Sequence, residues 1–160
     1  MRIKELMHAP AITCSEADSI NRAAQLMWEN DIGVIPVTDS DNRVVGMITD
    51  RDVAMAAYTT GAALPSMNVR DSMAKTVFSC GPEETIEAIE KRMQEARVRR
   101  FPVVDDEKRA VGIISVNDIA QYADSNQKNG VNREFVRTLA TISAPRAPIA
   151  EIAKSRKANA

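Results

Sequence analysis

The sequence predicts an α/β (α+β) fold made of two pseudo-symmetric units, and three observations lead to this prediction. A segment that begins at Ile3 recurs from Val69, an offset of 66 residues, and the register holds without a gap to Ala54 and Ala120. Each repeat alternates short apolar runs with stretches of helical periodicity. In a chain of 160 residues, one repeat alone would bury too little surface to be stable, so we expect the two to share a core.

Each repeat predicts the element order β-α-β-β-α. A short apolar strand opens it, over 11–14 in the first copy and 77–80 in the second. A helix follows, because apolar residues recur at helical spacing after a capping residue. We expect Asp18 or Ser19 to cap this helix in the first repeat and Thr85 to cap it in the second.

A pair of strands and a second helix complete each repeat. Tetrads rich in Asp, Ser and Asn mark the turns between paired strands. A proline inside the first strand of each pair indicates an edge position or an unpaired N–H at that point. The second helix begins at Thr49 or Ser115. The strands are expected over 34–37, 44–48, 101–104 and 111–114.

These elements divide the chain into a first unit over 1–66, a second over 67–124 and a C-terminal extension over 125–160. We expect the extension to hold a short helix from Arg133 to about Ile142, followed by a basic and mobile tail. Residues 133–160 carry six basic and two acidic side chains, so a weak contact with a partner is the alternative to a solvated terminus.

Composition narrows the class of protein. The formal net charge of −1 gives no support for nucleic-acid binding, and no apolar run of some 18 residues predicts a membrane helix. The N-terminus has no signal-peptide pattern, so a cytoplasmic location is expected. Cys14 and Cys80 share one repeat position, which favours two buried thiols over a disulfide. With His8 the single histidine, no zinc site of Cys and His is expected.

The motif with the most chemical content is Gly46-x-Ile48-Thr49-x-x-Asp52, which recurs as Gly112-x-Ile114-Ser115-x-x-Asp118. Two interpretations fit one copy. In the first, the hydroxyl and the carboxylate cap their own helix. In the second, the helix N-terminus binds a phosphate and the carboxylate accepts hydrogen bonds from a ribose. Duplication of the motif at equal distance from a proline-containing strand favours ligand binding.

The two copies resemble tandem CBS (cystathionine β-synthase) domains, which pair as a Bateman module, and the resemblance covers roughly residues 1–124. It implies two β-α-β-β-α units whose sheets pack with pseudo-two-fold symmetry. It also implies clefts between the units for adenosine-containing ligands such as AMP, ADP, ATP or S-adenosylmethionine. Such modules usually form homodimers, so a homodimer is expected.

The resemblance also implies roles for individual positions. Asp52 and Asp118 match the ribose-binding aspartates, and Thr49 and Ser115 match hydroxyls near phosphate. Thr13 and Ser79 match a hydroxyl at the end of each opening strand. Ile35 and Phe101 match the residues that flank the base, and the prolines that follow them are Pro36 and Pro102.

The two sites differ in charge. Arg51 can reach a phosphate in the first repeat, whereas its counterpart Asn117 is neutral. Arg99 and Arg100 precede Phe101 in the second repeat and suit a polyphosphate, unless they form only a solvated edge. We therefore hypothesise that the two sites bind ligand with different affinities.

The predicted function is that of a regulatory module rather than an enzyme. No Walker loop and no Gly-x-Gly-x-x-Gly motif is present, and one histidine with two symmetric cysteines does not suggest a nucleophile with its base. Ligand binding across two halves would couple an adenine nucleotide to a regulated partner protein. The alternative is a dimeric scaffold or interaction protein with empty clefts.

Overall fold

The computed structural model of the protein describes residues 1–125 and 131–143, and it places side chains for residues 1–123 and 135–143. The expectation of a mobile basic tail falls outside these residues. The elements in chain order are η1 (Ile3–Glu5), β1 (Cys14–Ser15), α1 (Ile20–Glu29), β2 (Val34–Thr38), β3 (Val44–Thr49), α2 (Asp50–Thr60), η2 (Leu64–Ser66), α3 (Val69–Ser72), α4 (Ile86–Ala96), β4 (Arg100–Val104), β5 (Ala110–Ser115), α5 (Val116–Ser125) and α6 (Val131–Ser143).

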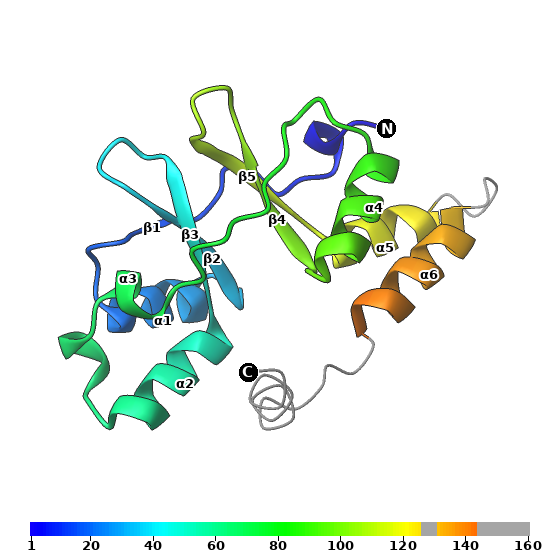
Figure 1. Cartoon of the computed structure of the whole chain (residues 1–160). Coiled ribbons are helices and arrows are strands. Elements are labelled where there is room, and N and C mark those ends of the chain that lie inside the picture. Colours follow the sequence, from blue (N-terminus) through cyan, green and yellow to red (C-terminus); the bar gives the residue numbers. More distant parts are fainter. Residues whose placement is uncertain (126–130, 144–160) are drawn as a thin grey trace, which may run out of the picture.

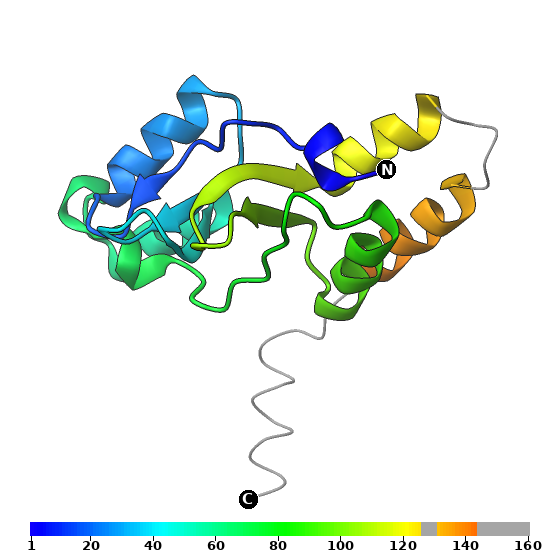
Figure 2. The same ribbon diagram turned by 90° about the horizontal axis from the view of Figure 1, so that it is seen from above.

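Two antiparallel hairpins lie at the centre of the molecule, β2–β3 in the first unit and β4–β5 in the second (Figure 1). Helices α1 to α3 lie beside the first hairpin and α4 to α6 beside the second (Figures 1 and 2). The hairpins share one register, with Val37 opposite Gly46 and Val103 opposite Gly112, and each has an irregularity directly after that pair. The mixed α+β class and the internal symmetry predicted from the sequence are confirmed.

Local capping signals set the helix boundaries. Ser19 caps α1, Thr49 caps α2 and Thr85 caps α4, each with its side-chain oxygen accepting a backbone N–H of the first turn. The helix expected from Arg133 to about Ile142 is present as α6. It packs against both α4 and α5 (Figure 1).

The opening strands are shorter than expected. Of the segment 11–14, only Cys14 joins a strand, β1, which pairs in parallel with Val37 and Thr38 of β2. The segment 77–80 contributes a single bridge between Cys80 and Val103. In the second unit the Pro102 carbonyl accepts the Cys80 N–H at 3.1 Å, so the opening segment bonds to the carbonyl of this proline and needs no N–H from it.

The single shared core expected from the sequence is not found: each sheet carries its own core, and each core includes a residue from the opening segment of the other repeat. Ile3 is fully buried in the second core with Ile89 and Phe101, and Val69 is fully buried in the first core with Ile48. In both views the N-terminal η1 accordingly lies beside the helices of the second unit (Figures 1 and 2). The two repeats therefore fold as one body.

Two glycines allow these crossing segments to approach the sheets. His8 forms an antiparallel bridge with Ile113 of β5, with N–O distances of 2.9 and 3.0 Å. A Cβ atom at Gly112 would lie 2.9 Å from the His8 carbonyl oxygen, too close for a side chain. In the first unit, a Cβ atom at Gly46 would likewise lie 3.1 Å from the carbonyl oxygen of Ala74. The glycine of the repeated motif thus brings the opening segment of one repeat onto the sheet of the other.

Candidate functional site

Asp118 lies at the start of α5, where it caps its own helix. Its Oδ2 accepts hydrogen bonds from the backbone N–H and the hydroxyl of Ser115, both at 2.7 Å, and its N–H donates to the Ser115 hydroxyl at 3.3 Å. The side chain is 7% exposed. Its Oδ1 lies 2.8 Å from Nε2 of His8, a contact that joins residues 110 positions apart.

Asp52 repeats this geometry at the start of α2. Its Oδ2 accepts from the backbone N–H of Thr49 at 2.8 Å and from the Thr49 hydroxyl at 2.7 Å. Within the described part of the chain, its Oδ1 accepts no hydrogen bond, because Ala74 occupies the position that corresponds to His8. The capping interpretation is therefore confirmed in both units, and it uses one oxygen of each carboxylate.

A cleft of about 510 Å³ opens beside Asp118, between the two units. Ser115, Asn117 and Asp118 line one side of it, and Arg100 on β4 reaches it from the same unit. The first unit contributes apolar side chains, and the N-terminal segment adds His8. The apolar residues on the walls are Pro10, Ile12, Ile32, Val34, Pro36 and Ile113. This volume is within the range of small-molecule sites, about 300–1,000 Å³.

Strand alternation decides which residues of β2 reach the cleft. Ile35 and Val37 point into the first core, where both are fully buried, so Val34 and Pro36 lie on the opposite face and line the cleft. In β4 the same alternation sends Phe101 into the second core and leaves Arg100 at the cleft. The side chains of Ile35 and Phe101, which the resemblance assigned to flank a base, are thus packed in the cores and do not line the cleft.

The other predicted site residues lie outside this cleft. Thr49, Arg51 and Asp52 are grouped at the start of α2, and Arg51 is exposed there. Thr13 lines a shallow hollow near the hairpin turns. Ser79 lines a separate hollow, and Pro102 is buried. Arg99 lies in a small hollow against α6 that Ser115 also lines.

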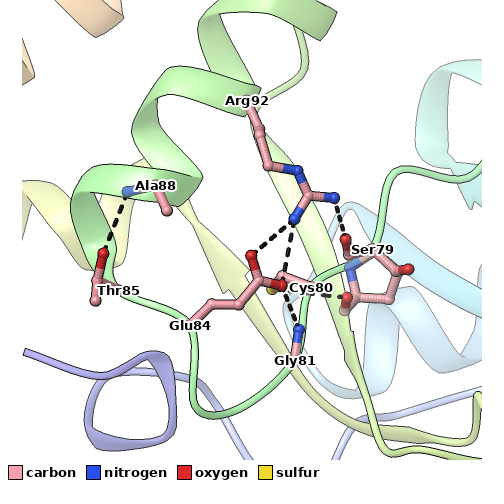
Figure 3. A network of polar contacts seen from close by, with 8 residues as sticks. Ser79, Cys80, Gly81, Glu84, Thr85, Ala88 and Arg92 are labelled. Atoms are coloured by element: carbon pink, nitrogen blue, oxygen red, sulfur yellow. Dashed lines mark hydrogen bonds and ion pairs between the residues drawn. The ribbon is translucent and has the colours of Figure 1, made fainter.

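Ser79 belongs to a polar network around Arg92 on α4 (Figure 3). The guanidinium donates to the Ser79 carbonyl and to Glu84, with 3.0 Å between Nη1 and Oε2. The second Glu84 oxygen accepts the Gly81 N–H at 2.7 Å. The guanidinium also lies 5.2 Å from the centre of the Phe101 ring. This network fixes the loop before α4, and the first unit has Leu26 in place of the arginine.

The two cysteines are buried free thiols, as expected. Burial raises the pKa of Cys14 to about 12, with a smaller contribution from the nearby Asp18 carboxylate. Burial likewise raises the pKa of Cys80 to about 12, and the neighbouring Glu84 adds to the shift. Both thiols therefore stay protonated at neutral pH and are poor nucleophiles.

Neither a metal centre nor a membrane span is found in the part of the chain that the structure describes. No three side chains of His, Cys, Asp or Glu converge there in a way that would hold a metal ion. No helix over 1–125 or 131–143 has the length and apolar character needed to cross a bilayer.

Sequence reasoning missed His8 as a cleft residue. It reaches Asp118 only because the N-terminal segment crosses to the sheet of the second unit, and nothing local to His8 signals that crossing. The glycine of the repeated motif was the available signal, since Gly112 is where the segment approaches.

Comparison with known proteins places this geometry in a family. A family model described as CBS domain matches residues 3–58 and again residues 69–125. Hypoxic response protein 1 from Mycobacterium tuberculosis is 31% identical over 119 residues, which are 74% of this chain and 82% of that protein. Homoserine O-acetyltransferase from Methanohalobium evestigatum is 30% identical over 122 residues, 76% of this chain, and the match spans 24% of the enzyme.

A solved structure shows the same architecture. The crystal structure of the CBS domain pair of protein MJ0100, in complex with 5'-methylthioadenosine and S-adenosyl-L-methionine, superimposes with a TM-score of 0.72. It is 26% identical to this chain, and the alignment covers 79% of this chain and 98% of that one.

Proposed function

The chain belongs to the CBS domain family, and on that premise we propose that it is a regulatory module that binds an adenosine-containing ligand between its two units. The ligand class comprises AMP, ADP, ATP and S-adenosylmethionine. The observation that carries the proposal is the cleft of about 510 Å³, whose apolar wall from the first unit faces Asp118 of the second. The bound complexes of the MJ0100 domain pair support the same class.

The apolar part of the cleft suits the adenine ring. Ile32, Val34 and Pro36 form its wall on the first unit, and Ile113 faces them from the second. A planar, weakly hydrated base gains free energy when such side chains remove it from water. The adenine is therefore assigned to this wall.

The polar end of the cleft suits ribose and phosphate. Asp118 offers its Oδ1 to ribose hydroxyls, since Oδ2 already accepts two hydrogen bonds from Ser115. The start of α5 and Arg100 on β4 line the same cleft, and both attract negative charge. Phosphate groups are therefore assigned to the side of Arg100 and Asn117.

The two candidate sites are unequal on this proposal. Asp118 lies in the inter-unit cleft with Arg100, whereas Asp52 lies outside that cleft with Arg51 exposed beside it. We assign the tighter binding to Asp118. Because this cleft is formed by both units, a ligand that binds there changes the free energy of their relative orientation, which a partner protein can sense.

A homodimer formed through α1 and α2 is part of the proposal. Trp28 on α1 is 88% exposed and Tyr58 on α2 is 81% exposed. The equivalent helices of the second unit, α4 and α5, are packed against α6, whereas in the described part of the chain no counterpart of α6 lies on α1 and α2 (Figure 1). Exposed apolar surface of this kind marks interaction sites. Sedimentation of the wild type as a dimer and of Trp28→Glu as a monomer supports this interface, and a monomeric wild type contradicts it.

Ligand-induced thermal stabilisation tests the binding proposal. A ligand present at 100 times its dissociation constant stabilises the native state by about 2.7 kcal/mol. We expect at least one of AMP, ADP, ATP and S-adenosylmethionine to raise the melting temperature of the wild type. Asp118→Asn, which keeps the shape of the cap, should abolish most of the shift.

Asp52→Asn is the matched control, because it makes the same change in the other unit. It should retain the greater part of the shift. A melting temperature that none of these ligands changes would refute the binding proposal in favour of a scaffold with empty clefts. Equal losses in the two variants would refute the assignment to Asp118.

A further inference from the structure

We propose that His8 is a built-in competitor for the ribose site, holding the one Asp118 oxygen that a bound sugar needs. This inference rests on the proposed function, because it assumes that Asp118 receives ribose. Its basis is the 2.8 Å contact between His8 Nε2 and Asp118 Oδ1 inside the inter-unit cleft.

A count of hydrogen-bond acceptors on the carboxylate explains the competition. A carboxylate offers about four acceptor positions, two on each oxygen. Ser115 fills both positions on Oδ2 of Asp118, and His8 fills one on Oδ1. One position remains, whereas the two adjacent hydroxyls of a ribose donate two hydrogen bonds. His8 must therefore move away before both hydroxyls can bind.

The position of His8 allows it to move. Its side chain is 75% exposed, whereas that of Asp118 is 7% exposed, so the imidazole rotates into solvent while the carboxylate stays in place. The backbone of His8 is held by its bridge to Ile113, which keeps the imidazole within reach after the ligand leaves. The result is a reversible latch rather than a permanent block.

The first unit lacks this latch. The residue that corresponds to His8 is Ala74, which makes the same backbone bridge to its sheet, with Met47, and has no side chain that could reach Asp52. Oδ1 of Asp52 accepts no hydrogen bond within the described residues, so that carboxylate keeps both positions for a diol. The latch is therefore a further difference between Asp118 and Asp52, in addition to their places inside and outside the cleft.

Adenosine titrated by calorimetry is the appropriate probe, because it presents the ribose diol without phosphate groups. His8→Ala should bind adenosine about three- to tenfold more tightly than the wild type, the value of one neutral hydrogen bond. His8→Gln keeps a hydrogen-bond donor at this position, so it should bind adenosine within about threefold of the wild type. Ala74→His, the mirror change in the first unit, should leave binding at Asp118 unchanged.

The analogue 2'-deoxyadenosine separates competition from a purely structural effect. In the wild type the analogue needs only the vacant position, so it should bind within about threefold of adenosine. In His8→Ala both hydroxyls of adenosine can bind, so the preference for adenosine should increase. An unchanged preference, or weaker adenosine binding in His8→Ala, overturns the latch while leaving the nucleotide site intact. Loss of binding in Asp118→Asn shows that the site is the one tested, and no binding by the wild type overturns both proposals.

Discussion

Replacement of Gly112 by alanine tests how the N-terminal segment is held against the second unit. The new Cβ would lie 2.7 Å from Met7 Sδ and 2.9 Å from the His8 carbonyl oxygen. Met7 can move its flexible end, but the His8 carbonyl is fixed, because it accepts the Ile113 N–H at 3.0 Å. The segment from Met7 to His8 must therefore retreat from β5.

The expected cost follows from the bonds that this retreat breaks. His8 and Ile113 exchange two backbone hydrogen bonds, each worth about 0.5–1.5 kcal/mol, so their loss costs about 1–3 kcal/mol. Alanine returns about 0.5–1 kcal/mol by restricting the unfolded chain relative to glycine. Relative to the wild type, the net loss of unfolding free energy should be about 0–2.5 kcal/mol, which lowers the melting temperature by up to roughly 10 °C in a chain of this size.

Urea denaturation followed by circular dichroism measures this loss, and Gly81→Ala is the matched control. The nearest atom to a Cβ at Gly81 is Glu84 Oε1 at 3.9 Å, an ordinary contact, so this variant should gain the same stabilisation of about 0.5–1 kcal/mol and lose no hydrogen bond. Gly112→Ala should therefore be about 1–3 kcal/mol less stable than this control. If Gly112→Ala is as stable as Gly81→Ala, the close approach of the N-terminal segment does not limit this position and the reasoning fails.

Three further predictions concern the packing around the site. Cys14 and Cys80, whose pKa values are raised to about 12 mainly by burial, should react with a disulfide reagent at pH 8 only after urea unfolds the chain; fast native labelling would contradict this. Arg92→Leu, which installs the residue of the first unit, should reduce stability by about 1–3 kcal/mol in urea, because a partly buried carboxylate loses its partner. Ile142→Ala on α6 should cost about 2–4 kcal/mol, whereas Leu139→Ala on the same helix, 40% exposed, should cost clearly less; equal effects would mean that α6 does not pack as described.

Features fixed by local chemistry were predictable from the sequence. Hydroxyl side chains at Thr49 and Ser115, each with an aspartate three residues on, specify helix starts whatever lies around them. The hairpins follow from paired apolar runs around polar turns. The register of Gly46 and Gly112 opposite equivalent valines also follows, because the repeat places both glycines at one position of the motif.

Features that depend on distant parts of the chain were not predictable. The resemblance assigned Ile35 and Phe101 to flank a base, but the face that a strand residue takes depends on where the core lies, and both side chains are fully buried in the cores. The opening segments were assigned to their own repeats, yet Ile3 packs in the second core. The contact of His8 with Asp118 depends on that exchange and has no local signal.

The most direct test of the central claim is a crystal structure of the protein grown with saturating AMP. The account predicts the base against Val34 and Pro36, the sugar hydroxyls within hydrogen-bond distance of Asp118 Oδ1, and the imidazole of His8 turned away. A cleft without nucleotide in such crystals, with Asp118 still bound only to Ser115 and His8, would contradict it.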